Sequence, residues 1–102
     1  MQFAIIARDG SDPDAVARRQ AVRQHHLGGI QPLVDAGHIL AGGAMLDDDG
    51  NMRGSVLLVD FPSRAELDAW IDHDPYVTDG VWQQIEVVPF RAAVGAWMPE
   101  DA

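Results

Sequence analysis

The sequence has no cysteine and no lysine, so its seven basic residues are all arginines. Without cysteine the chain can form no disulfide, thiol nucleophile, cysteine-ligated zinc site or iron–sulfur cluster, and this agrees with a cytoplasmic protein. The apolar run within residues 1–7 is too short for a signal peptide or a membrane span, so we expect neither secretion nor membrane insertion. The formal net charge of −9, without a strong basic patch, argues against a nucleic-acid partner.

Length and composition predict one compact domain. A chain of 102 residues with 47% apolar and 23% charged residues can bury one core but is too short for two. We place the domain at residues 1–97 and interpret residues 98–102 as a flexible acidic tail.

Periodicity and turn residues predict the element order βαββαβ. Four strands are expected, at residues 1–8, 38–45, 54–60 and 81–94. The first helix is expected to begin at Pro13, with Asp12 as its N-cap, and to end just before Gly37. The second begins at the capping box that opens with Ser63 and ends before Pro75. This order is typical of a ferredoxin-like α+β sandwich, a four-stranded antiparallel sheet with two helices on one face. The other face would lack a covering layer, so we expect a homodimer that pairs through it.

Glycine and proline interrupt the regular pattern at two places. In the first helix the pair Gly28-Gly29 and Pro32 weaken helical hydrogen bonding, so we expect a kink or a tight backbone approach just after His26. In the next strand the pair Gly42-Gly43 predicts a bulge, or a place where a ligand or another backbone comes close. The buried face of the first helix is predicted from its apolar spacing to contain Val16, Ala17, Leu27, Ile30, Leu33 and Val34.

Two residues far apart in the sequence are candidates for chemistry. His26, in the first helix, is either a half-buried histidine satisfied by hydrogen bonds or a general base. Asp74, at the end of the second helix, is either a turn residue before Pro75 or the carboxylate that orients the imidazole. Because both helices are expected on one face of the sheet, the fold can bring these two side chains together.

The charged neighbours of His26 also leave two interpretations open. Arg18, Arg19 and Arg23 form either a solvated helix face that pairs with nearby aspartates or a rim that binds an anion. His25 and His26 point about 100° apart on a helix and cannot chelate one ion together. We therefore expect no metal and no cofactor. No role follows from the sequence for His25 or His73.

Five segments in order resemble the YCII-related domain family over nearly the whole chain. They are Arg23-Gln24-His25-His26-Leu27, Ala41-Gly42-Gly43-Ala44-Met45, Gly54-Ser55, Trp70-Ile71-Asp72-His73-Asp74-Pro75-Tyr76 and Glu86-Val87-Val88-Pro89-Phe90. The resemblance implies a ferredoxin-like dimer with a His–Asp site at His26 and Asp74. It also implies a small-molecule role, since one type of member is a dehydrochlorinase and the fold is similar to that of muconolactone isomerases and small monooxygenases.

These observations lead to the hypothesis of a cofactor-independent lyase or isomerase acting on a small cyclic or enolisable substrate. His26 would transfer the proton and Asp74 would orient it, while Arg23, Ser55 and Tyr76 would bind substrate oxygen atoms. One alternative is a non-catalytic dimeric domain that binds a small ligand. A second is a cofactor-free monooxygenase of the same fold, with Trp70 or Trp82 lining the pocket.

Overall fold

The computed structural model describes residues 1–96, so the predicted tail and the last residue of the predicted domain lie outside the described part. The elements are β1 (Gln2–Asp9), α1 (Ala15–Asp35), β2 (Ile39–Leu46), β3 (Met52–Asp60), α2 (Arg64–His73), α3 (Pro75–Thr78) and β4 (Trp82–Phe90). All predicted strands and helices are present, and α3 is an additional single turn. The ferredoxin-like α+β fold is confirmed.

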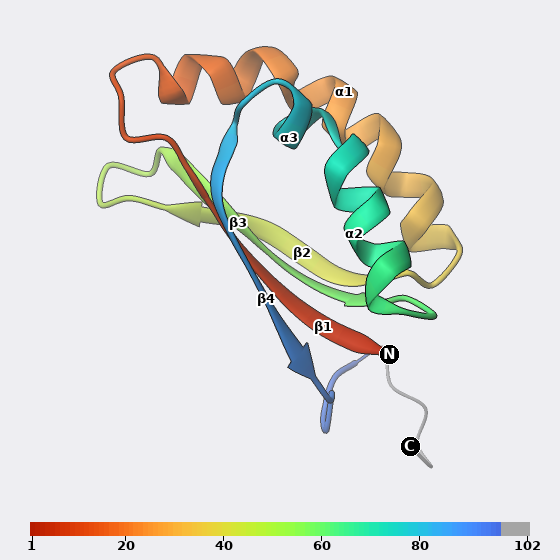
Figure 1. Ribbon diagram of the computed structural model, residues 1–102. Coiled ribbons are helices and arrows are strands. Elements are labelled where there is room, and N and C mark those ends of the chain that lie inside the picture. The colour runs from red at the N-terminus through yellow and green to blue at the C-terminus, as the bar shows by residue number, and fades with distance from the viewer. Residues whose placement is uncertain (97–102) are drawn as a thin grey trace.

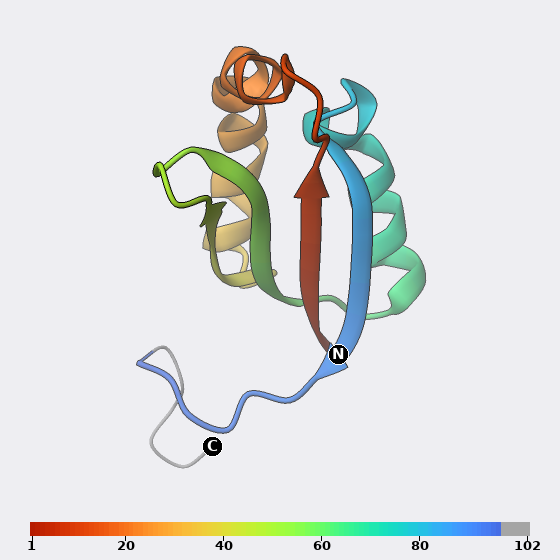
Figure 2. The ribbon, with the colours of Figure 1, turned by 90° about the vertical axis from the view of Figure 1, so that its left-hand side faces the viewer.

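The sheet has the strand order β2-β3-β1-β4, and all three pairings are antiparallel. Both long helices lie on the same face, with α1 against β2 and β3 (Figure 1). Figure 2 shows α1 and α2 behind the strands, on the same face of the sheet. Pro89 is tolerated because β4 is an edge strand. Among the described residues, neither long helix combines the length and apolar character that a membrane crossing requires.

The core lies between the sheet and the helices. The register pairs Phe3 with Val59, Ile5 with Leu57 and Ala7 with Ser55, so all six side chains face the helices. Helix α2 contributes Leu67 and Ile71, as its sequence pattern predicts, and Trp70 is partly buried against the same cluster. Ser55 is the polar member of this face and is buried among apolar neighbours.

The buried face of α1 differs from the predicted one. Its fully buried positions are Ala15, Arg19 and His26, and Val22, Ile30 and Leu33 pack against the core as partly buried residues. Leu27 and Val34, which were predicted to be buried, are 39% and 42% exposed. The prediction failed because apolar spacing cannot identify a buried face on which two positions are an arginine and a histidine.

The start of α1 also differs from the prediction, whereas its end agrees with it. The helix begins at Ala15, with Asp14 as N-cap and no side-chain capping bond. The carboxylate of Asp12 accepts the Asp14 amide, as an N-cap side chain does, and also pairs with the Arg18 guanidinium, but residues 12–14 form a turn that precedes the helix. At the other end, Gly37 follows the helix with φ +80°, a backbone conformation that favours glycine.

The glycine pairs occupy other environments than expected. A Cβ atom at Gly28 or Gly29 would have no neighbour within 4 Å, so no tight backbone approach occurs there, and α1 continues through both residues. The register of β2 shifts between Ile39 and Ala41 and between Met45 and Leu46, not at the Gly42-Gly43 pair. That pair instead lines a cavity between α1 and β2, and the predicted approach of a ligand at this place stays a prediction.

Candidate functional site

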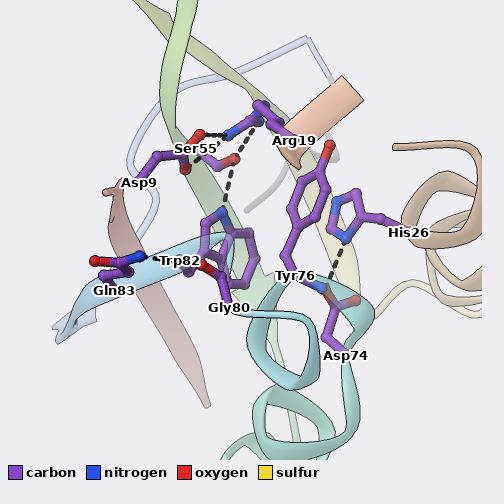
Figure 3. A network of polar contacts seen from close by, with 9 residues as sticks. All are labelled: Asp9, Arg19, His26, Ser55, Asp74, Tyr76, Gly80, Trp82 and Gln83. Atoms are coloured by element: carbon purple, nitrogen blue, oxygen red, sulfur yellow. Dashed lines mark hydrogen bonds and ion pairs between the residues drawn. The ribbon is translucent and has the colours of Figure 1, made fainter. Parts of the chain in front are cut away.

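The fold brings the predicted histidine and aspartate into contact. His26 Nδ1 lies 2.8 Å from Asp74 Oδ2 (Figure 3). Both side chains are buried, with 8% of His26 and 2% of Asp74 exposed. His26 comes from the middle of α1 and Asp74 from the junction of α2 and α3, so only the packing of these elements on one sheet face creates the pair.

Asp74 holds its position because it belongs to two helices at once. It is the C-cap of α2 and the N-cap of α3, where Pro75 occupies the first turn. Its Oδ2 atom accepts the backbone N–H of Tyr76 at 2.9 Å in addition to the imidazole. A carboxylate held by two donors cannot rotate freely, so the orientation of the His26 ring is set by the backbone of α3.

This contact determines which nitrogen of His26 is available for chemistry. When Asp74 is ionised it only accepts hydrogen bonds, and Nδ1 is then the donor in the contact between His26 and Asp74. The neutral imidazole then presents the lone pair of Nε2, which can accept a proton. The carboxylate also stabilises the imidazolium that this transfer produces, which is the arrangement of an oriented general base.

Aromatic rings surround the imidazole. The Tyr76 ring is stacked on His26, with centroids 3.8 Å apart and planes inclined by 9°. Trp82 meets the His26 ring edge-on at 5.6 Å. The Arg19 guanidinium carbon lies 4.7 Å from the centroid of the same tyrosine ring. The imidazole is therefore fixed on several sides and has little rotational freedom.

A cavity of about 420 Å³ opens beside His26, between α1 and strands β2 and β3. Its volume is in the range of small-molecule binding sites. Its wall is mostly apolar, and its ionisable groups are Arg19, Arg23, His26 and Tyr76, with no aspartate or glutamate among the lining residues. Asp9 pairs with Arg19, so Arg23 is the lining arginine whose charge remains available to an anionic ligand. The other lining residues are Leu27, Ile30, Val34, Ile39, Leu40, Ala41, Gly42, Gly43, Ala44, Met52, Ser55 and Leu57.

Next to the cavity, Arg19 takes part in a buried polar chain that the sequence did not reveal. Its Nη1 atom donates to both carboxylate oxygens of Asp9 at 3.0 Å, and its Nη2 donates to Ser55 Oγ at 2.7 Å. Trp82 Nε1 donates to the same hydroxyl oxygen at 3.2 Å. Burial raises the pKa of the Asp9 carboxyl above its usual range, although the Arg19 guanidinium opposes this effect. The only sequence signal for Arg19 was its seven-residue spacing from His26.

The other predicted residues are placed as follows. Arg23, Ser55 and Tyr76 all line the cavity, together with His26. The Trp82 ring contacts the His26 imidazole edge-on, and the Trp70 ring packs near Phe61. Neither tryptophan is among the residues that line the cavity. The expectation that Trp70 or Trp82 lines the pocket is therefore wrong, because both indoles pack in or against the hydrophobic core.

The remaining histidines and arginines lie away from this site. His25 is exposed, and His73 Nδ1 contacts the carbonyl of Ala69 at 2.7 Å on the exposed side of α2. Arg18 pairs with Asp12 on the surface, so the arginine cluster is divided between a solvated pair and the cavity. Within residues 1–96, no group of three or more histidine or acidic side chains is arranged to hold a metal ion.

The burial of Tyr76 predicts that the stability of the fold depends on pH. Burial raises the pKa of its phenol above the usual value, which outweighs the lowering effect of Arg19 and Arg23. The folded state therefore holds this proton more tightly than the unfolded state, and the resulting stability is complete below about pH 10 and is lost as the pH rises through the folded pKa.

We expect the free energy of unfolding to fall as the pH rises from about 9 to 12. The chain has no lysine and no cysteine, so no other type of side chain in it ordinarily titrates in this range. Tyr76→Phe should remove this dependence. Tyr76 is the only tyrosine, so its ionisation can be followed directly by tyrosinate absorbance in the folded and the urea-unfolded protein. Identical titration curves in the two states would contradict the prediction.

The fold and the site define a ferredoxin-like α+β domain with a buried His–Asp pair beside a mostly apolar cavity. The model of the YCII-related domain matches residues 1–91, and the chain belongs to this family. It is 36% identical over 97 residues to protein YciI of Escherichia coli O6:H1, with 89% of this chain and 97% of that protein covered.

Solved structures show the same fold. A 5-chloro-2-hydroxyhydroquinone dehydrochlorinase from Burkholderia phenoliruptrix AC1100, solved in complex with 2,5-dihydroxybenzoquinone, superposes with a TM-score of 0.79 at 26% identity, covering 91% of this chain and 96% of that one. A dimeric ferredoxin-like protein of unknown function from Jannaschia has a TM-score of 0.51 at 16% identity, covering 89% of this chain and 98% of that one. The second likeness concerns the fold alone.

Proposed function

We propose that this protein is a cofactor-independent enzyme that transfers a proton on a small anionic ring, as a lyase or an isomerase. His26 Nε2 is the group that accepts or delivers the proton, and Asp74 orients the imidazole and stabilises its charged form. The observation that carries this proposal is the 2.8 Å contact between His26 Nδ1 and Asp74 Oδ2 at the wall of a cavity of about 420 Å³.

The charge and the dimensions of the cavity support a small anionic substrate. Arg23 brings positive charge to the wall, and the Tyr76 phenol, which is protonated at neutral pH, can donate a hydrogen bond. Leu27, Ile30 and Leu57 supply apolar surface for a ring. Arg23, Ser55 and Tyr76 are therefore proposed as the groups that bind substrate oxygen atoms.

The dehydrochlorinase with the same fold supports this reaction class. Loss of hydrogen chloride from a ring requires that a proton is transferred and that chloride leaves with its bonding electron pair, and one oriented base is sufficient for the proton transfer. Such a reaction consumes no external oxidant or reductant.

Two assays test the proposal. The first incubates the protein with 5-chloro-2-hydroxyhydroquinone under anaerobic conditions and measures chloride release. The second uses 2-hydroxyhydroquinone in D2O and measures deuterium incorporation into the ring by NMR. Activity in either assay above the buffer rate is the expected result. Binding of the ring without chloride release or deuterium exchange would instead identify a non-catalytic binding domain.

We also propose that the domain is a homodimer that pairs through the sheet face opposite the helices. Antiparallel register places Val56, Val88 and Phe90 on this face, where they are 38%, 40% and 42% exposed. Ala4, Ile6 and Leu58 share the face and are only partly buried in the single chain. Such an uncovered apolar sheet is typical of an interface.

The dimer can be tested by placing a charge at its proposed centre. We expect Val56→Glu to shift the sedimentation coefficient from that of a dimer to that of a monomer, because an unpaired carboxylate in an apolar interface is strongly unfavourable. Leu46→Glu is the matched control, since Leu46 is 62% exposed at the end of β2. A wild-type protein that sediments as a monomer would exclude this interface.

A further inference from the structure

The cavity between α1 and β2 is larger than a single ring requires. Its volume is about 420 Å³. An apolar cavity of about 150 Å³ is sufficient to hold benzene. A ring placed beside His26 therefore leaves more than half of this volume for another part of the ligand.

The polar groups of the cavity gather at one end. The Tyr76 ring stacks on His26 and lies beside the Arg19 guanidinium. Ser55 contacts Arg19 and lies opposite Ala44 in the register of β2 and β3, so this end of the cavity is near the end of β2. The proposed function places the polar part of the ligand here.

The opposite end of the cavity is apolar. It is lined by Val34 near the end of α1 and by Ile39 and Leu40 at the start of β2. Ile30 lies between this end and His26. With a helical rise of about 1.5 Å per residue, Ile30 and Val34 are about 6 Å and 12 Å from His26 along the helix axis. An aliphatic wall therefore continues for about two helical turns beyond the imidazole.

A glycine in β2 keeps the space along this wall open. Gly42 pairs with Leu57, whose side chain faces the helices, so a side chain at position 42 would point the same way. A Cβ atom there would already meet Leu57 Cγ at 3.3 Å. The space that a larger residue would fill is part of the cavity.

Two large apolar side chains of α1 remain exposed at the cavity wall. Leu27 is 39% exposed and Val34 is 42% exposed, and both line the cavity. Exposed apolar surface inside a concave site is typical of a place that an apolar ligand group covers. A charged group at the Val34 end would find only aliphatic side chains there and would lose its hydration without gaining a partner.

We infer that the ligand of this cavity is a hydroxylated ring with an apolar substituent, which extends along α1 from His26 toward Val34. The inference rests on the proposed function in placing the ring beside His26. It adds that the substituent is a separate source of affinity, because it is bound by aliphatic side chains at the end of the cavity away from the polar groups.

The test measures the binding of 4-ethylresorcinol, 4-butylresorcinol and 4-hexylresorcinol by calorimetry. We expect Kd to fall by about threefold to fourfold for each added methylene, because each one is buried against the wall of α1. An equal Kd for the three compounds, weaker binding of the longer ones, or no binding of any of them would contradict the inference.

A pair of matched variants separates this site from nonspecific binding of an apolar chain. Val34→Asn places an amide at the apolar end, so it should weaken binding of the hexyl compound by about tenfold and leave the ethyl compound unchanged. Val94→Asn makes the same substitution at a residue that is 85% exposed beyond β4, and it should retain wild-type binding of both. A hexyl compound that binds Val34→Asn as tightly as the wild type would overturn the inference.

A variant at the polar end tests the orientation of the ligand. Arg23→Gln should weaken the binding of all three compounds by a similar factor and leave the dependence on chain length intact. If Arg23→Gln instead removes the dependence on chain length, the substituent lies at the polar end and the inference is wrong. The melting temperature of each variant shows whether a lost response reflects unfolding.

These results are distinguishable from failure of the proposed function. Binding that depends on chain length and on Val34, without chloride release or deuterium exchange, supports the substituent site and rejects the proton-transfer enzyme. Turnover of an unsubstituted ring, with equal binding of the three alkyl compounds, does the opposite.

Discussion

His26→Gln should lower kcat/KM for an identified substrate by about 10²- to 10⁴-fold, because it removes the oriented base and leaves the cavity in place. Glutamine is preferred to alanine here, since His26 is buried against Tyr76 and Asp74 and a truncation would leave a hole and an unpaired carboxylate. The measurement is steady-state kinetics, with the melting temperature recorded to confirm that the variant is folded.

The adjacent histidine supplies a matched control. His25 is exposed on the same helix turn, so His25→Gln should retain wild-type kcat/KM. Asp74→Asn should reduce activity without removing the histidine, because its amide can donate to Nδ1 and so favour the tautomer that carries the proton on Nε2. If His26→Gln is as active as the wild type, His26 is not the base. If His25→Gln and His26→Gln lose activity equally, the loss reflects a disturbed α1 and not the removal of a base.

The second large effect concerns stability. Arg19→Met should reduce the free energy of unfolding by about 3 to 5 kcal/mol, because it leaves the buried Asp9 carboxylate without its partner. For a small domain this is a large part of the total. Urea denaturation followed by tryptophan fluorescence would measure it. Adding Asp9→Asn to the same chain should recover part of the loss, since the unpaired charge is then removed.

The neighbouring arginine makes this prediction specific. Arg18 also pairs with an aspartate, but Arg18 and Asp12 are partly exposed, so the ion pair is screened by water. Arg18→Met should therefore change the denaturation midpoint far less than Arg19→Met. Similar midpoints for the two variants would mean that the buried pair contributes no more than a surface pair does.

Much of the fold was predictable because its signals are local. Ser63 caps α2 as predicted, with Ser63 Oγ accepting the Glu66 amide, and the helix stops before Pro75. The same kind of signal was present for α3, since Asp74-Pro75 places a capping aspartate before a proline at the first helical position. The sequence interpretation used that pattern at Asp12-Pro13, where no helix begins, and not at Asp74-Pro75, where one does.

The candidate site was only partly predictable. The resemblance to the family pointed to His26 and Asp74, and the structure places them in contact. Arg19 was considered only as a charged neighbour, because an arginine on a helix is usually exposed and nothing in its local sequence indicates burial. Its partner Asp9 lies just after the strand predicted at residues 1–8 and was given no role.

The sequence by itself determined the order of strands and helices, the single core and the family, because periodicity, caps and turns act between residues that are close along the chain. Only the tertiary structure decided that α1 turns Arg19 and His26 toward the sheet, that Asp9 and Ser55 meet Arg19, and that a cavity remains beside them. The physical reason is that burial of a charge is favourable only when its partners are already assembled, and these partners come from three different elements of the fold.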